Sequence, residues 1–161
     1  MTQIATVRAQ LPALLPRLRR FARALARHAA DADDLLQIAL ERALNRSGQW
    51  DPQLKLESWM FGIIRNAWID ELRSRSRRAD VFAPEALGEN VGVADATQAA
   101  VVVHDAMERL PEEQRSAVAL VLVAGLSYQE AADVVGIPVG TLTSRLARGR
   151  DALQALLGDP Q

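Results

Sequence analysis

The side chains that could do chemistry in this sequence are carboxylates, arginines and small hydroxyls, gathered in three short stretches. Residues 31–34 hold three aspartates at the start of a predicted helix, where carboxylates face the positive end of the helix dipole. Residues 73–78 hold four arginines, and residues 141–150 combine threonine and serine with three arginines. Arginines and hydroxyls in such clusters bind phosphates and base edges. The chemistry that we expect is therefore binding.

The sequence lacks the residues that most enzymes and metal sites need. It has no cysteine, which excludes thiolate catalysis, disulfides and zinc–thiolate sites. Its two histidines, His28 and His104, are isolated, and we expect structural or surface roles for them. Because no glycine-rich phosphate loop is present either, we predict that the protein is not an enzyme and uses no cofactor or metal.

Charge is distributed unevenly along the chain, although the formal net charge is only −1. Residues 1–78 carry 14 Lys and Arg against 8 Asp and Glu, whereas residues 79–107 carry five acidic residues and no basic one. A basic block followed by an acidic stretch with glycine and proline is typical of a domain followed by a linker. We therefore predict two small helical domains, 1–78 and 97–161, joined by a flexible acidic linker at 79–96.

Helices must position the clusters, since aromatic residues make up only 4% and apolar residues recur at helical spacing. An all-α fold is expected. In the first domain we predict helices over 11–25, over about 31–45 and from Ser58, its plausible cap, into the arginine run, with a loop at 49–53. The third helix has an apolar stripe that we assign to the core: Trp59, Met60, Ile63, Ile64, Ala67, Trp68 and Leu72.

The second domain ends in the pattern of a helix-turn-helix. Earlier helices are predicted over 97–109 and from Pro111 to about Gly125. A capping box at 127–130 then opens a short helix with small residues, and glycine and proline turn the chain into a last helix over 139–157. Such a second helix can present its first side chains to the major groove of DNA.

Length and hydropathy limit the number of domains and the cellular location that we expect for the protein. Its 161 residues, 49% of them hydrophobic, suffice for one compact domain or two small ones and exclude wholesale disorder. The longest apolar run, 117–126, is too short to span a bilayer, and no charged-then-apolar leader opens the chain. We therefore expect a cytoplasmic protein without membrane insertion.

Five segments of the chain resemble segments of bacterial RNA polymerase sigma factors of the extracytoplasmic-function group, in the same order. They are D-A-D-D-L-L-Q (31–37), S-W-M-F-G-I-I-R-N (58–66), L-P-E-E-Q-R (110–115), G-L-S-Y-Q-E-A-A (125–132) and P-V-G-T-L-T-S-R-L-A-R-G-R (138–150). These sigma factors have only the region-two and region-four domains, joined by a linker. The resemblance covers roughly residues 11–157.

For the first domain, the resemblance implies docking on core RNA polymerase and handling of the minus-ten promoter element. The acidic helix would bind the clamp coiled coil of the largest polymerase subunit through Asp34, Gln37 and Glu41. The loop 49–55 would face the minus-ten element, where a flipped base needs a shaped pocket. The residues assigned in this way to minus-ten DNA are Gln49, Trp50, Lys55, Arg65, Asn66, Arg73 and Arg77.

For the second domain, the resemblance implies binding to the polymerase flap and reading of the minus-thirty-five element in the major groove. The base-proximal candidates are Thr143, Ser144, Ala147 and Arg148, and the phosphate-proximal ones are Val139, Gly140 and Thr141. Basic or larger residues often stand in the family where this chain has Thr143 and Ala147. We therefore expect fewer base contacts here, or a dependence on DNA shape.

The partners implied are core polymerase, promoter DNA and an anti-sigma factor that restrains the protein in a stress or signal response. The protein would then be a monomer when free or a heterodimer with the anti-sigma factor. The alternative is a freestanding helix-turn-helix regulator, which binds duplex DNA alone and usually dimerises on a symmetric site. That alternative leaves the acid-started helix and the tryptophan-rich helix without a role.

Overall fold

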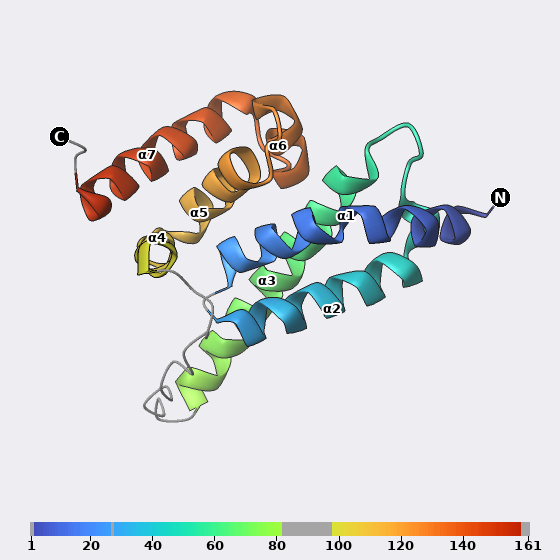
Figure 1. Ribbon diagram of the computed structural model, residues 1–161, viewed down its shortest axis with the longest axis horizontal. Coiled ribbons are helices and arrows are strands. Elements are labelled where there is room, and N and C mark those ends of the chain that lie inside the picture. Colours follow the sequence, from blue (N-terminus) through green and yellow to red (C-terminus); the bar gives the residue numbers. More distant parts are fainter. Residues whose placement is uncertain (1, 27, 82–97, 159–161) are drawn as a thin grey trace.

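The computed structural model describes residues 2–26, 28–81 and 98–158, and these residues form helices and no strand. The elements are α1 (Gln3–Leu25), α2 (Ala29–Asn45), η1 (Ser47–Gln49), α3 (Leu56–Val81), α4 (Gln98–Glu108), α5 (Glu112–Val118), η2 (Ala119–Val123), α6 (Tyr128–Val135) and α7 (Val139–Leu157). Figure 1 shows α1 to α3 packed together, with α4 to α7 as a second group across α1 and the first turns of α3. The predicted all-helical fold is confirmed.

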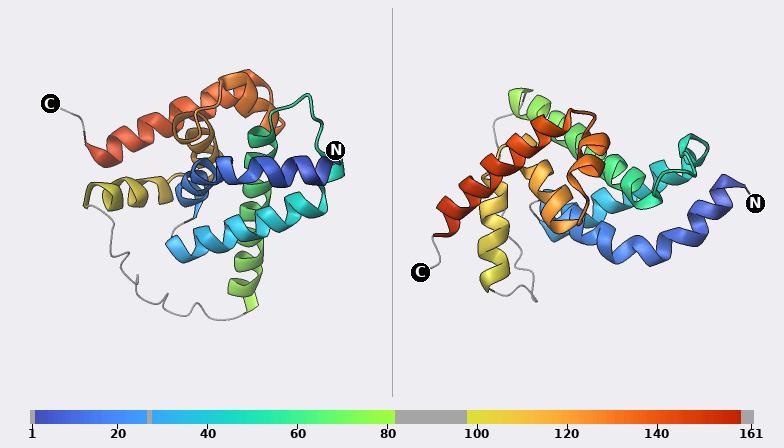
Figure 2. Two further views of the ribbon diagram at one scale, coloured as in Figure 1. Left: turned by 45° about the vertical axis from the view of Figure 1, so that its right-hand side comes forward. Right: turned by 90° about the horizontal axis from the view of Figure 1, so that it is seen from above.

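Helix α1 is longer than predicted and is curved. It begins at Gln3 rather than Leu11, with the hydroxyl of Thr2 accepting a hydrogen bond from the amide of Ala5 as an N-cap. Pro12 and Pro16 lie inside the helix on its exposed side, and each removes a backbone donor. Prolines on the outer face bend a helix around the core on its inner face, and the curvature is visible in Figure 2.

The start of α3 differs from the prediction. The helix begins at Leu56, because the carbonyl of Lys55 already accepts a hydrogen bond from the amide of Trp59 at 3.3 Å. Ser58 is therefore not the cap: it lies in the first turn, and its hydroxyl is buried without a hydrogen-bond partner among the described residues. The prediction failed because a serine before an apolar run has the same pattern in a cap and in a first turn.

The apolar stripe of α3 is core, as predicted. Met60 and Ile64 are fully buried, and Phe61 packs against Phe21 of α1 with ring centroids 5.0 Å apart. At its other end α3 continues to Val81, so the first residues of the predicted linker are helical. The rest of that predicted linker lies outside the described residues.

The helix-turn-helix has the predicted bounds and turns. Ser127 and Glu130 form the capping box of α6, and Gly136 ends that helix at φ +80°, a left-handed conformation that favours glycine. Ala131 and Ala132 are fully buried where α6 meets its neighbours. The small side chains permit this close packing, and the turn sets the direction of α7.

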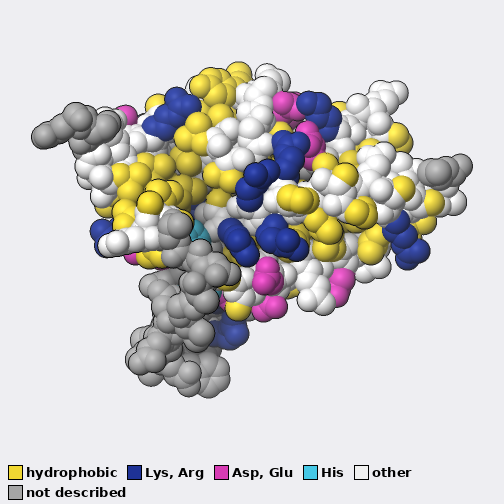
Figure 3. Space-filling model, in the orientation of Figure 1, with side chains coloured by type: hydrophobic (Ala, Val, Ile, Leu, Met, Phe, Trp, Pro, Cys, Tyr) yellow, Lys and Arg dark blue, Asp and Glu magenta, His cyan; other side chains and the backbone are white. Residues whose placement is uncertain are grey.

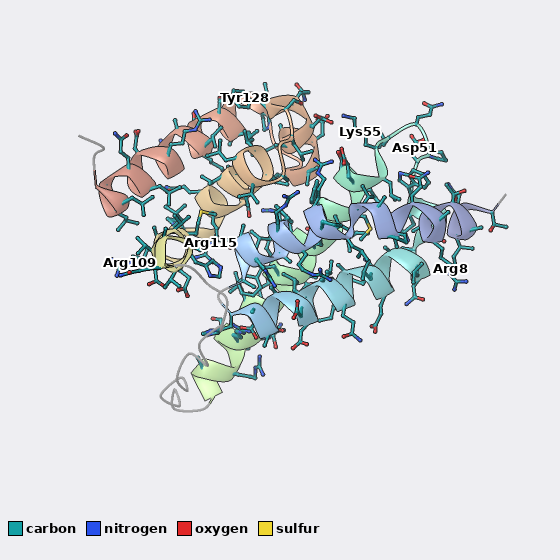
Figure 4. The ribbon with its side chains drawn as sticks, viewed as in Figure 1. Arg8, Asp51, Lys55, Arg109, Arg115 and Tyr128 are labelled. Carbon is teal, nitrogen blue, oxygen red and sulfur yellow. The ribbon has the colours of Figure 1, made fainter. Side chains whose placement is uncertain are left out.

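Arg115 of α5 joins the two groups of helices. Its guanidinium donates to the carbonyl of Leu25 at the end of α1 and to the carbonyls of Glu108 and Leu110 after α4. The carbonyls of Leu25 and Glu108 belong to helix ends, which lack intrahelical donors, and that of Leu110 lies in the turn between α4 and α5. Figure 4 shows Arg115 beside α4, next to the end of α1.

The two groups share one continuous core, a question that the sequence left open. Leu18 and Phe21 of α1 belong to the same buried cluster as Leu120 of η2 and Leu126, which follows η2. Helices α3 and α6 also touch, with the α-carbon of Gly62 facing Val134. The protein therefore has its two domains packed against each other in this structure.

The crossing of α5 and α7 generates a stability prediction. A Cβ atom on Gly149 would lie 2.7 Å from Cγ2 of Val118 and 3.3 Å from the carbonyl oxygen of Gln114, whereas one on Gly140 would meet nothing within 4 Å. We expect Gly149→Ala to lower the free energy of unfolding by about 1–3 kcal/mol. Gly140→Ala, in the same helix, should raise it by up to about 1 kcal/mol. Urea unfolding followed by circular dichroism measures both, and equal effects would contradict the steric account.

Candidate nucleic-acid interface

The first half of α7 presents the residues predicted to read the minus-thirty-five element. Val139, Gly140, Thr141, Ser144, Ala147 and Arg148 are exposed, and Thr143 is half-buried. Between them Leu142 and Leu146 are buried and fix the helix in the core. The hydroxyl of Thr143 donates to the carbonyl of Gly140 at 2.9 Å, within its own helix. The structure therefore brings all seven residues to one end of one helix.

The residues predicted to bind polymerase lie together on α2. Asp34, Gln37 and Glu41 are exposed at spacings that place them on one side of the helix, and Ile38 beside them is 40% exposed. The opposite side of α2, including Ala39 and the fully buried Ala43, packs against α1 and α3. The result is an acidic surface with an apolar side chain at its centre.

A polar groove runs between α2 and α3. Its lining residues are Arg42, Arg46, Arg65, Asn66, Ile69, Asp70 and Arg73. Three of these, Arg65, Asn66 and Arg73, were predicted to line the path of a DNA strand. Arg42 and Arg46 were not among the predicted residues. Two arginines four residues apart at the end of α2 lie on one side of the helix, and this spacing could have indicated a basic surface. Arg42 pairs with Asp70 at 3.1 Å, which holds one of the cations in place.

The arginine run at the end of α3 divides into two parts. Arg73 and Arg77 are exposed, as expected for DNA contacts. Arg75 instead pairs with Asp31 of α2 and with Glu71, each at 3.0 Å, and its guanidinium lies 5.5 Å from the ring centre of Trp68. Burial opposes the charge of Arg75, but the hydrogen bonds that it donates to the carboxylates of Asp31 and Glu71 raise its pKa. Arg75 and Asp31 therefore join α3 to α2.

The loop before α3 holds Trp50 in the interior. Trp50 is only 5% exposed, its indole N–H donates to the carbonyl of Leu54 at 3.1 Å, and its own carbonyl accepts from Gln3. Trp50 thus supports the loop from within, and its assignment to minus-ten DNA stays a prediction. Gln49 and Lys55 remain exposed on either side of it.

Two of the predicted minus-ten residues contact the second domain. The ammonium of Lys55 lies 3.1 Å from a carboxylate oxygen of Glu130 in α6. Figure 4 labels Lys55 just before the first turn of α3. The guanidinium of Arg65 donates to the hydroxyl of Ser116 in α5 at 3.3 Å. Trp68 donates from its indole N–H to Glu112 at 3.3 Å. No pattern within either segment predicts these contacts.

The environment alters the acid–base behaviour of two of these groups. Burial, followed by the nearby charge of Arg145, lowers the pKa of Arg65, and the carboxylates of Glu112 and Glu113 oppose that effect. The pKa of Glu130 lies below its usual range, first because the amide of Ser127 donates to its carboxylate and then because Lys55 does. Cations from the first domain therefore face carboxylates from the second.

Other parts of the described surface carry different features. Among the described residues, no group of three or more His, Asp or Glu side chains is placed to hold a metal ion, and no helix is both long and apolar enough to cross a membrane. His104 shares a hydrogen bond with the carbonyl of Arg23. The face drawn in Figure 3 has a broad hydrophobic area. The exposed hydrophobic side chains of the described residues include Val101, Val102 and Val103 of α4 and Leu156 and Leu157 of α7.

Comparison with known proteins identifies the family. Residues 12–78 match the family model "Sigma-70 region 2", and residues 100–153 match "Sigma-70, region 4". The chain is 37% identical over 159 residues to the ECF RNA polymerase sigma factor EcfG of Rhodopseudomonas palustris, covering 94% of this chain and 85% of that one. The chain belongs to the sigma-70 family. Within it, the extracytoplasmic-function group that the motifs resemble is confirmed.

Two further relatives agree. This sigma factor is 39% identical over 144 residues to SigM of Mycobacterium tuberculosis, covering 88% of this chain and 71% of that one. A crystal structure of the sigma factor RpoE in complex with the anti-sigma factor NepR from Bartonella quintana superposes with a TM-score of 0.82. That chain is 30% identical, and the match covers 97% of this sigma factor and 99% of RpoE. The two family segments contain all the site residues discussed above.

The divided arginine run of this sigma factor generates a second prediction. We expect Arg75→Ala to lower the free energy of unfolding by about 1 kcal/mol, because it removes two partly exposed ion pairs and the stacking on Trp68. Arg77→Ala, in the same run and exposed, should change it by less than about 0.5 kcal/mol. Equal stabilities of the two variants in urea unfolding would show that Arg75 does not join the helices.

Proposed function

We propose that this sigma factor binds core RNA polymerase in the bacterial cytoplasm and directs initiation at promoters with minus-ten and minus-thirty-five elements. Residues 1–78 act as the polymerase and minus-ten domain, 79–96 as the linker and 97–161 as the minus-thirty-five domain. The observation that carries the proposal is that one chain combines an exposed α7 recognition surface with an acidic α2 surface and a basic groove. The protein performs no catalysis of its own in this scheme.

The second domain reads duplex DNA through α7. Its N-terminal side chains are exposed while Leu142 and Leu146 between them are buried, so the helix can enter the major groove without unpacking the domain. Arg148 is the side chain of this set best suited to a guanine edge, because a guanidinium can donate two hydrogen bonds to it. The small Ser144 and Ala147 allow close approach of the helix, and the first-turn amides face phosphates.

The first domain binds the single DNA strand of the melted minus-ten element. Gln49 and Lys55 flank the loop that Trp50 supports from within, and Arg65, Asn66 and Arg73 continue along the groove. Arg77 extends the basic surface beyond it. A row of cations along a groove follows the phosphates of a single strand with little regard to sequence. The loop would supply the sequence preference.

The acidic side of α2 supports polymerase docking. Asp34, Gln37 and Glu41 are exposed on one side of α2, as a binding surface requires, and Ile38 adds an apolar contact. A freestanding regulator would have no use for this surface, and the family to which the chain belongs does not favour that alternative. An anti-sigma factor is proposed as a regulatory partner, since the similar RpoE was solved in complex with one. The exposed valines of α4 offer apolar area to such a partner.

Run-off transcription tests the proposal. We expect bacterial core polymerase to produce transcripts with a shared upstream motif from a promoter library only when this protein is added. Glu41→Arg should reduce these transcripts at least tenfold without lowering the midpoint of urea unfolding, whereas Asp133→Arg, also exposed, should reduce them less than twofold. Binding of the protein alone to a palindromic duplex, without any transcript, would instead establish a freestanding regulator.

Recognition by α7 is tested with two arginines of the same helix. On a template with an intact minus-thirty-five element, Arg148→Ala should cost about 5- to 150-fold in transcript yield, because a bidentate base contact is worth about 1–3 kcal/mol. Arg150→Ala should stay within about twofold. On a template without that element the two variants should be equal, and a loss by Arg148→Ala on both templates would exclude base reading.

A further inference from the structure

The loop that precedes α3 is held by the first turn of α1. Nε2 of Gln3 donates to the carbonyl of Trp50 at 2.6 Å, across 47 residues of sequence. The start of α1 and this loop lie at the same end of the molecule, as Figure 1 and Figure 2 show, and α1 packs against η1 there. Gln3 lies outside residues 12–78, the segment that matches the sigma-70 region 2 model. A residue outside the family segment therefore contacts the loop to which the proposed function assigns the minus-ten element.

Two hydrogen bonds in series connect Gln3 to the exposed part of the loop. The first joins Gln3 to the carbonyl of Trp50, and in the second the indole N–H of Trp50 donates to the carbonyl of Leu54 at 3.1 Å. Trp50 is only 5% exposed, so it connects α1 to Leu54 through the interior of the protein. The amide of Leu54 also donates to the carbonyl of Asp51 at 2.9 Å. The position of Leu54 thus depends on that of Trp50.

The exposed part of the loop offers side chains suited to an unstacked base. At 61%, Leu54 is the most exposed large hydrophobic side chain among the described residues, and Gln53 beside it is exposed too. A base that leaves the stack loses contact with its neighbours, and an apolar side chain can replace that contact. The amide of Gln53 can donate to the edge of such a base and accept from it. Because hydrogen bonds depend on distance and direction, sequence preference requires these side chains to be held in place.

The first turns of α1 are packed so that Gln3 has a fixed position. Thr2 caps the helix with its hydroxyl. Val7, one turn further along the same side of α1, is fully buried. A Cβ on Gly48 of η1 would lie 3.9 Å from Oε1 of Gln3. The side-chain amide of Gln3 therefore lies next to η1 as well as to the carbonyl of Trp50.

We propose that Gln3 is a positioning residue for minus-ten recognition: it fixes Trp50 and, through the indole of Trp50, the exposed side chains of the loop. This inference rests on the proposed function, because it takes the loop as the part that reads the minus-ten element. A loop that already has its bound conformation loses less conformational entropy when DNA binds. Without the donor of Gln3, the carbonyl of Trp50 needs another partner, and the loop is no longer held to α1 at this point. Preference for one minus-ten sequence then falls, whereas reading of the minus-thirty-five element by α7 stays the same.

Run-off transcription on a matched set of templates tests this role. The set holds the promoter found with the library, variants of it with single base changes in the minus-ten element, and one with the minus-thirty-five element replaced. Gln3→Met keeps the length of the side chain and removes its donor. We expect it to lower at least fivefold the ratio of transcripts from the unchanged promoter to those from the minus-ten variants. The corresponding minus-thirty-five ratio should stay within twofold, and Gln10→Met, at an exposed position of the same helix, should leave both ratios within twofold.

The outcomes separate a positioning role from a merely structural one. Equal losses by Gln3→Met on all templates would show that Gln3 only stabilises the fold, and would overturn the inference. Unchanged ratios would overturn it too, and would leave the sigma activity established. If the unchanged protein supports no transcription with core polymerase, the proposed function fails and the inference fails with it.

Hydrogen exchange of the free protein is a second measurement, which needs neither DNA nor polymerase. Gln3→Glu has the shape of glutamine, lacks the donor and places a negative charge at a helix N-terminus, where such a charge is favourable. We therefore expect α1 to remain folded while the amides of Trp50 and Leu54, both hydrogen-bonded within the loop, exchange at least fivefold faster. Gln10→Glu, the same change in the same helix, should leave their exchange within twofold. Equal exchange in the two variants would overturn the inference.

Discussion

The planar guanidinium of Arg115 binds three backbone carbonyls at once, and these join the two domains. They are the carbonyls of Leu25 at the end of α1, of Glu108 at the end of α4, and of Leu110 in the turn before α5. Lysine could not replace Arg115 here. A guanidinium is planar and has five N–H donors that can reach separate acceptors, whereas an ammonium has its three donors on a single nitrogen. With α5 held in this way, η2 packs on α1 and α6 on α3. The contacts of Lys55 with Glu130 and of Arg65 with Ser116 accompany that placement.

Much of the fold was predictable from local signals. The capping box of α6, Gly136 and the leucines of α7 specify their helices within a few residues of sequence, and the structure has the expected bounds. The signals failed where the sequence is ambiguous over a short range. The first turns of α1 have no strong apolar period and are followed by Pro12 and Pro16. Ser58 has the sequence pattern of a helix cap, although it lies inside α3. Helix ends are decided by hydrogen bonds that a periodic pattern does not encode.

The candidate site was predictable only in part, for a different reason. Exposure of the first residues of α7 and of the acidic side of α2 follows from helical periodicity alone. Burial of Trp50 and the pairing of Arg65 with Ser116 depend on residues far away in the chain. No pattern within one segment shows which surface another segment covers. Arg42 and Arg46 line the groove because α2 packs against α3, and the sequence of α2 alone does not show that packing.

The separation in sequence between the contacting domains has a consequence for synthesis on the ribosome. Arg17 donates to the carbonyl of Ala124, 107 residues further along the chain. At about 5–20 residues added per second, the ribosome needs about 5–20 s to produce the second of these residues after the first. Helix α3, which follows Lys55 and contains Arg65, can fold during that interval, and Glu112 and Glu130 emerge later. A nascent polypeptide therefore exposes these cations before it possesses the carboxylates that pair with them.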